Sequence, residues 1–148
     1  MDLGLWHEMA SNSLEEFAPL PYVLVADDDD DARDFVAGVL RRAGLHVCEA
    51  CDGEELLERY KSLQVLAADG LIVVSDVGMP GCDGILATGE LRKASATVPI
   101  VIVTAFEDAT TSRQAYAAGA DLVLIKPVRR DTLLDAVRIL MQRIERRP

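Results

Sequence analysis

The chain has 148 residues, which suits one domain, and half of its residues are apolar, enough to bury a core. Its formal net charge of −10 makes it a poor nucleic-acid binder, because phosphate contacts require clustered lysine and arginine. Three cysteines are too few for a disulfide framework, and no run nears the ~18 apolar residues of a membrane helix, so we expect a cytoplasmic protein that does not enter a membrane.

The first twenty residues differ in pattern from the rest of the chain. Their apolar residues are irregularly spaced, and Pro19 and Pro21 leave room for at most a short helix. We expect residues 1–20 to form a mobile N-terminal extension, with the folded domain spanning residues 21–146. The alternative is an arm that packs on a partner through Trp6.

Two similar units open the folded part of the chain. A continuous apolar run over Tyr22–Ala26 predicts a strand that is buried on both faces, and the segment after it has helical period and can end at Gly44. A second run, Leu45–Ala50, precedes a second helical segment that starts near Asp52. The alternation of strand and helix therefore begins at once.

Three more units of the same kind follow. Their apolar runs are Leu71–Ser75, Val98–Val103 and Leu122–Ile125. The first two helices follow Asp83 and Asp108, and the last runs from about Asp131. The helix after Asp108 has few large apolar residues, so we expect it to be the least firmly packed. Five strand–helix units in succession predict an α/β fold with a doubly wound parallel sheet. Ligands of such sheets bind beyond the carboxyl ends of the strands.

Charged and polar residues follow these strands at the expected binding edge. Five aspartates, residues 27–31, follow the first strand, Asp76 follows the third, Thr104 ends the fourth and Lys126 follows the fifth. Gathered carboxylates repel one another, and a divalent cation such as Mg²⁺ relieves that cost. Lys126 and Thr104 could hold phosphoryl oxygens beside such an ion. The alternative for the aspartate run is a solvated acidic loop, in which Asp30 or Asp31 caps the next helix.

Four segments resemble the receiver domains of bacterial response regulators, over about residues 21–146. They are Val23–Asp29, Ser75–Gly84, Val101–Ala105, and Ala118–Asp121 followed by Ile125–Pro127. The resemblance implies a flavodoxin-like (β/α)5 fold with strand order 2-1-3-4-5. It also implies two-component signalling, in which the domain catalyses only its own phosphorylation and autodephosphorylation.

The resemblance assigns a role to each site residue. Asp76 would accept the phosphoryl group. Asp28, Asp76 and the backbone carbonyl of Gly78 would bind Mg²⁺ directly, with Asp27 acting through water or completing the acidic site. Lys126 would pair with the phosphoryl group and precede a cis bond to Pro127, and Thr104 would move inward to hydrogen-bond the same group.

The resemblance also implies partners and a switch. The donor would be a sensor histidine kinase or a phosphotransfer protein, and the output or dimer surface would comprise the last strand and the helices on either side of it. Two positions depart from the pattern. Val123 stands where many receivers carry an aromatic residue, and Gly78 stands where relatives often carry a longer side chain.

Three rival interpretations remain open. Asp27-x-Asp29 superficially fits the first motif of haloacid-dehalogenase phosphohydrolases, although no further acidic pair follows the lysine. The domain could also be a receiver that acts without phosphate. Finally, Cys48 and Cys51 form a C-x-x-C pattern, but strand alternation predicts that their side chains lie on opposite faces, which disfavours a zinc or redox site.

Overall fold

The computed structural model of the protein describes residues 20–66, 70–105 and 108–145. The expected extension over residues 1–20 lies outside the described residues except for Leu20, which is half-buried against the core. None of the helices within these ranges is long and apolar enough to cross a membrane.

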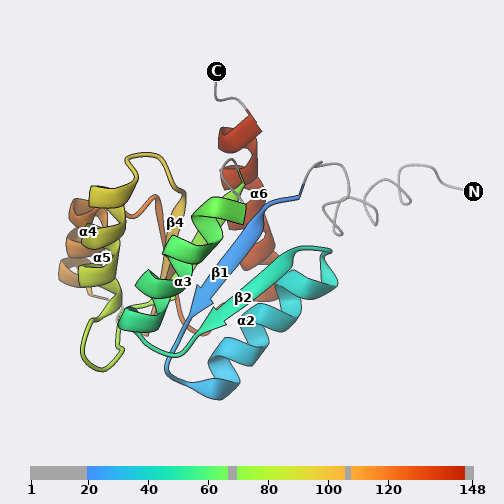
Figure 1. Ribbon diagram of the computed structural model, residues 1–148. Coiled ribbons are helices and arrows are strands. Elements are labelled where there is room, and N and C mark those ends of the chain that lie inside the picture. Colours follow the sequence, from blue (N-terminus) through green and yellow to red (C-terminus); the bar gives the residue numbers. More distant parts are fainter. Residues whose placement is uncertain (1–19, 67–69, 106–107, 146–148) are drawn as a thin grey trace, which may run out of the picture.

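Strands and helices alternate along the whole described chain (Figure 1). In order, the elements are β1 (Tyr22–Ala26), α2 (Asp30–Arg42), β2 (His46–Ala50), α3 (Gly53–Leu66), β3 (Leu71–Asp76), α4 (Gly84–Ala94), β4 (Ile100–Thr104), α5 (Ala109–Ala118), β5 (Leu122–Ile125) and α6 (Arg130–Glu145). All the predicted strands and helices are present, and most of their ends lie within two residues of the predicted positions. The largest strand shift is in β4, which begins at Ile100 because Pro99 has no N–H to pair with a neighbour.

The five strands form one parallel sheet in the order β2-β1-β3-β4-β5. This confirms the doubly wound, flavodoxin-like fold. Ala26 pairs with Ala50 on one side and with Ser75 on the other, and Ser75 pairs with Ile102. The strands therefore end nearly level, and the residues that follow them share one edge of the sheet.

The helices cover both faces of the sheet and enclose two apolar clusters (Figure 1). On one face, α2 and α6 pack on alternate strand residues, among them Val25, Val74 and Val103. On the other face, α3, α4 and α5 pack on residues such as Leu24 and Val73. Strands buried on both sides explain the continuous apolar runs in the sequence.

Aspartate is the N-cap of α2, α4 and α5, and Asp52 accepts a hydrogen bond from the N–H of Glu55 at the start of α3, but one cap differs from the prediction. Asp29, and not Asp30 or Asp31, is the N-cap of α2, and its carboxylate accepts hydrogen bonds from the N–H groups of Asp31 and Ala32. The prediction was wrong by one residue because any aspartate of the run satisfies the capping preference, and only the exit angle of β1 selects among them. Asp29 is therefore occupied with the helix and does not point toward the other strand ends.

The helix expected to be the least firmly packed has a thin buried face. In α5 only Ala115 is buried, whereas four residues of α2 are buried. The end of α5 is set by Gly119, which adopts a left-handed conformation with φ of 119°. A helix with so little buried apolar area is held less strongly than its neighbours.

Candidate functional site

The register of the sheet brings the candidate residues to one edge. Asp76 is the last residue of β3 and pairs with Val103, one residue before Thr104 at the end of β4. The N–H of Lys126 donates to the carbonyl of Thr104 at 2.7 Å, and the N–H of Asp27 donates to the carbonyl of Ala50 at 3.1 Å. Residues that are far apart in sequence are thus held at neighbouring strand ends by backbone hydrogen bonds.

Three carboxylates meet at this edge. Asp27, Asp28 and Asp76 each offer an oxygen, and these oxygens lie within 4.8 Å of one another. The side chain of Asp76 is 11% exposed and that of Asp27 is 7% exposed, whereas Asp28 lies open to solvent. Carboxylate oxygens at such spacing match the hard oxygen ligands that Mg²⁺ prefers, and the open side of Asp28 leaves access for an ion.

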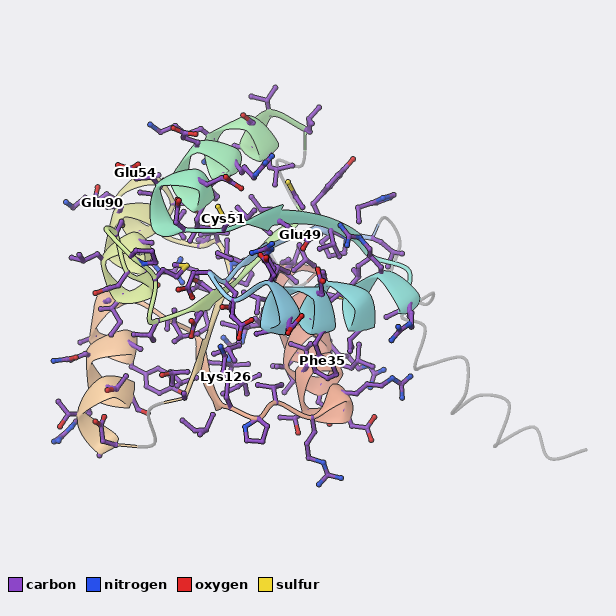
Figure 2. The ribbon with its side chains drawn as sticks, turned by 90° about the horizontal axis from the view of Figure 1, so that it is seen from below. Phe35, Glu49, Cys51, Glu54, Glu90 and Lys126 are labelled. Atoms are coloured by element: carbon purple, nitrogen blue, oxygen red, sulfur yellow. The ribbon has the colours of Figure 1, made fainter. Side chains whose placement is uncertain are left out.

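Lys126, labelled in Figure 2, follows the end of β5 and contacts two of these carboxylates. Its Nζ donates to Oδ2 of Asp27 at 3.0 Å and lies 3.4 Å from Oδ1 of Asp76. Burial disfavours its charged form, but the hydrogen bond to Asp27 and the charge of Asp76 outweigh burial and raise the pKa of Lys126. Both neighbouring carboxylates therefore favour the charged form of Lys126.

The single lysine does not fully compensate the charge on Asp76. Burial, together with repulsion from Asp27, raises the pKa of Asp76 above its usual value, although Lys126 acts in the opposite direction. Three carboxylates face one lysine at this edge, so the site has an excess of negative charge that a divalent cation would relieve. Because the pKa of Asp76 is raised, acidification would protonate its carboxylate at a higher pH than that of an ordinary aspartate.

Two further predicted site residues also lie near this edge. Thr104 is fully buried, and its position at the end of β4 follows from the pairing of that residue with Ile125. Gly78 is exposed in the loop after β3, and a Cβ built on it would meet nothing within 4 Å. The bond between Lys126 and Pro127 is cis, as the resemblance implied.

The loop that carries Asp76 is closed by a tight contact with α4. A Cβ on Gly84 would clash with the carbonyl oxygen of Asp76, so only glycine fits at this position. The N–H of Gly84 donates to the carbonyl of Val77 at 3.0 Å, and the hydroxyl of Ser75 donates to the carbonyl of Asp76 at 2.9 Å. These contacts fix the backbone from which the Asp76 carboxylate projects.

The placement of Cys48 and Cys51 corrects one expectation. Cys48 and Cys51 do not face opposite sides, because β2 ends at Ala50 and strand alternation does not extend to Cys51. The Cys48 sulfur accepts from Arg59 of α3 at 3.9 Å, and the Cys51 thiol donates to Glu55 of the same helix at 3.5 Å. Among the described residues, the acidic group is the one cluster with metal-ligand spacing, and it contains no cysteine.

Sequence reasoning missed one residue that contacts the acidic strand end. The guanidinium of Arg33, on α2, donates to the backbone carbonyl of Asp27 at 2.8 Å and to the carboxylates of Asp30 and Glu49. A signal was present in the sequence. Arg33 lies three and four residues before the buried Val36 and Ala37, so a charged residue falls on the buried face of its helix.

Three comparisons with known proteins agree with this geometry. Residues 23–138 match the family model described as the response regulator receiver domain. The chain is 31% identical to the chemotaxis protein CheY of Halobacterium salinarum, an alignment that covers 78% of this chain and 92% of that protein. A solved structure of chemotaxis protein CheY4 of Vibrio cholerae superposes with a TM-score of 0.74 at 29% identity, covering 82% of this chain and 98% of that one.

Other relatives are longer than this chain. It is 31% identical to response regulator RR06 of Streptococcus pneumoniae, and the alignment covers 82% of this chain but 53% of that protein. The chain thus spans about half the length of such curated relatives. The similarity to RR06 therefore concerns only the aligned half of that protein.

Proposed function

The chain belongs to the family of response regulator receiver domains, and from that premise we propose that it accepts a phosphoryl group on Asp76 in two-component signalling. The donor would be a phosphohistidine of a sensor histidine kinase or of a phosphotransfer protein. The observation that carries the proposal is the meeting of Asp27, Asp28, Asp76 and Lys126 at one edge of the sheet. We place this reaction in the cytoplasm.

The acidic group would hold one Mg²⁺ ion. Asp28 and Asp76 would supply carboxylate oxygens and Gly78 its backbone carbonyl, with Asp27 acting through water or completing the acidic site. The chemistry supplied by bound Mg²⁺ is neutralisation of charge on the phosphoryl oxygens. The donor set supports this assignment because its ligands are oxygens and its charge exceeds what Lys126 compensates.

Asp76 would act as the nucleophile. An oxygen of its carboxylate attacks the phosphorus, the bond from phosphorus to the donor imidazole nitrogen breaks, and the imidazole leaves with the electron pair. Lys126, already 3.4 Å from Asp76, would pair with a phosphoryl oxygen as that charge develops. The reaction modifies the domain's own side chain, so the domain catalyses only its own phosphorylation and hydrolysis.

The new phosphoryl group would shift the balance between two conformations. The group would attract the hydroxyl of Thr104 and the ammonium of Lys126, and these contacts would form in only one of the two conformations. Phosphorylation shifts the equilibrium only by this difference in free energy between the two conformations. The thin buried face of α5 makes this helix the element most easily repacked. A coupling of about 1–3 kcal/mol is usual for such systems.

The surface formed by α5, β5 and α6 would carry the output or support a homodimer. Tyr116 of α5 and Ile139 of α6 are each almost half exposed, so this surface has apolar side chains to offer. The N–H of Val123, on the edge strand β5, donates to the Tyr116 hydroxyl at 3.2 Å. The position where many receivers carry a switching aromatic is therefore linked here to an aromatic residue on α5.

The haloacid-dehalogenase alternative has less support. That motif requires the second aspartate of Asp27-x-Asp29 to face the reacting group, whereas Asp29 caps α2. A phosphatase would also release nitrophenol from p-nitrophenyl phosphate repeatedly, which we do not expect of a phosphoacceptor.

The stoichiometry of phosphorylation tests the proposal. With acetyl phosphate and Mg²⁺ in excess, we expect intact-mass spectrometry to show one added phosphoryl group per chain. We also expect no sustained release of nitrophenol from p-nitrophenyl phosphate. Repeated turnover of that substrate without a phosphorylated chain would support the phosphohydrolase and refute the receiver proposal.

A further inference from the structure

We propose that Arg33 is a positioning residue that holds the acidic turn, residues 27–29, in the geometry that binds the divalent ion. The inference rests on the proposed function, because it concerns the ion that the acidic group would hold. Arg33 is not expected to touch the ion or the phosphoryl group. It acts through the backbone of Asp27.

Arg33 makes three directed contacts with its guanidinium. Nη1 donates to the carbonyl of Asp27 at 2.8 Å, Nη2 to Asp30 at 2.7 Å and Nε to Glu49 at 3.2 Å. Its side chain is 16% exposed, and its bonds to Asp27 and Glu49 are partly buried, whereas the bond to Asp30 is open to solvent. A planar guanidinium can bind three acceptors in fixed directions, whereas a lysine ammonium at this place could not match all of them.

The contact with Arg33 holds the backbone of Asp27 next to β2, one residue beyond the last paired residue of β1. The N–H of Asp27 is bound to the carbonyl of Ala50, and its carbonyl is bound, through Arg33, to Glu49. Two neighbouring residues of β2 therefore anchor both backbone groups of Asp27. Figure 2 shows Glu49 on β2 beside the first turns of α2, where Arg33 lies.

Asp28 needs this anchor more than Asp27 or Asp76 does. The carboxylate of Asp27 is held by the N–H of Asp29 at 2.9 Å and by Lys126, and Asp76 is part of β3. Asp28 is exposed and follows Asp27 directly, so the direction of its side chain depends on how the turn is held. Loosening the carbonyl of Asp27 would let Asp28 leave the group of three carboxylates.

If only the charge of Arg33 mattered, replacing it would change the Mg²⁺ affinity in the opposite direction from the loss of its positioning contacts. Removing a positive charge near three carboxylates would, by Coulomb attraction alone, strengthen cation binding. Asp30 and Glu49 pair with the guanidinium, which further reduces any repulsion that it exerts on the ion. The two roles therefore predict changes in affinity of opposite sign.

Two substitutions and a control separate these roles by isothermal titration of the apo-protein with MgCl₂. We expect Arg33→Met and Arg33→Lys each to weaken Mg²⁺ binding by about tenfold. This is the lower end of the loss in metal affinity that follows the mutation of residues that orient metal ligands. At saturating Mg²⁺, we expect the rate of phosphorylation by acetyl phosphate to recover to near that of the unaltered protein. Arg41→Met is the matched control, because Arg41 binds the same Glu49 at 3.0 Å but does not contact the acidic turn. We expect it to leave the Mg²⁺ affinity unchanged.

Each other result would overturn the inference. Tighter binding by Arg33→Met, or full affinity in Arg33→Lys, would show that only the charge of Arg33 matters. Unchanged binding by Arg33→Met would show that Arg33 does not position the acidic turn for the ion. Equal weakening by Arg41→Met would trace the effect to Glu49 in general. If Arg33→Met fails to give a cooperative thermal transition, Arg33→Lys decides the question. A wild-type protein that binds no Mg²⁺ would instead refute the proposed function itself, which is a distinguishable outcome.

Discussion

Replacing Asp76 with asparagine is expected to abolish phosphorylation by acetyl phosphate completely. Asparagine has almost the same size and keeps the backbone contacts with Ser75 and Gly84, so the loop should retain its shape. It lacks the carboxylate oxygen that forms the bond to phosphorus. The measurement is intact-mass spectrometry after incubation with acetyl phosphate and Mg²⁺.

The control for this substitution lies in the same acidic part of the chain. Asp31 is exposed in the first turn of α2 and is outside the group of three carboxylates. We expect Asp31→Asn to accept one phosphoryl group at the normal rate. Phosphorylation of the Asp76→Asn protein to the level of this control would show that the acceptor is another residue.

Replacing Asp28 with asparagine is expected to weaken Mg²⁺ binding by more than the roughly tenfold typical of residues that only orient ligands. The substitution removes one of three negative charges and a hard oxygen ligand at the most accessible position of the group. Phosphorylation at low millimolar Mg²⁺ should then slow in proportion to the lost occupancy. Calorimetric titration with MgCl₂ measures the affinity, and a chelator added to the wild-type protein should stop phosphorylation.

Thermal unfolding gives an independent check on the same ion. A ligand that binds only the folded state stabilises it, by about 2.7 kcal/mol at a hundred times its dissociation constant. Mg²⁺ should therefore raise the melting temperature of the wild-type and Asp31→Asn proteins, and should raise that of Asp28→Asn much less. An equal increase in all three would place the bound ion elsewhere.

The layout of the sheet and the location of the site could be predicted from the sequence. Strands such as Tyr22–Ala26 and Leu71–Asp76 are buried on both faces, and burial on both faces leaves a continuous apolar run that is easy to recognise. The polar residue that follows such a run must leave the core at the strand end. This rule alone placed Asp27, Asp76 and Lys126 at one edge, where the structure brings them together.

Details that depend on contacts between distant parts of the chain could not be predicted from the sequence. The choice of Asp29 as the helix cap depends on the direction in which the chain leaves β1. The shared orientation of Cys48 and Cys51 toward α3 depends on where β2 ends. The helical pattern places Arg33 on the buried face of α2, but its partner Glu49, sixteen residues away, could not be identified from the sequence.

Direct identification of the modified residue in the wild-type protein tests the central claim most directly. The protein would be phosphorylated with acetyl phosphate and Mg²⁺, reduced with borohydride to convert the acyl phosphate to homoserine, and digested for tandem mass spectrometry. Our account predicts homoserine at residue 76 and at no other aspartate. Homoserine at Asp27, Asp28 or another position, with residue 76 unmodified, would contradict it.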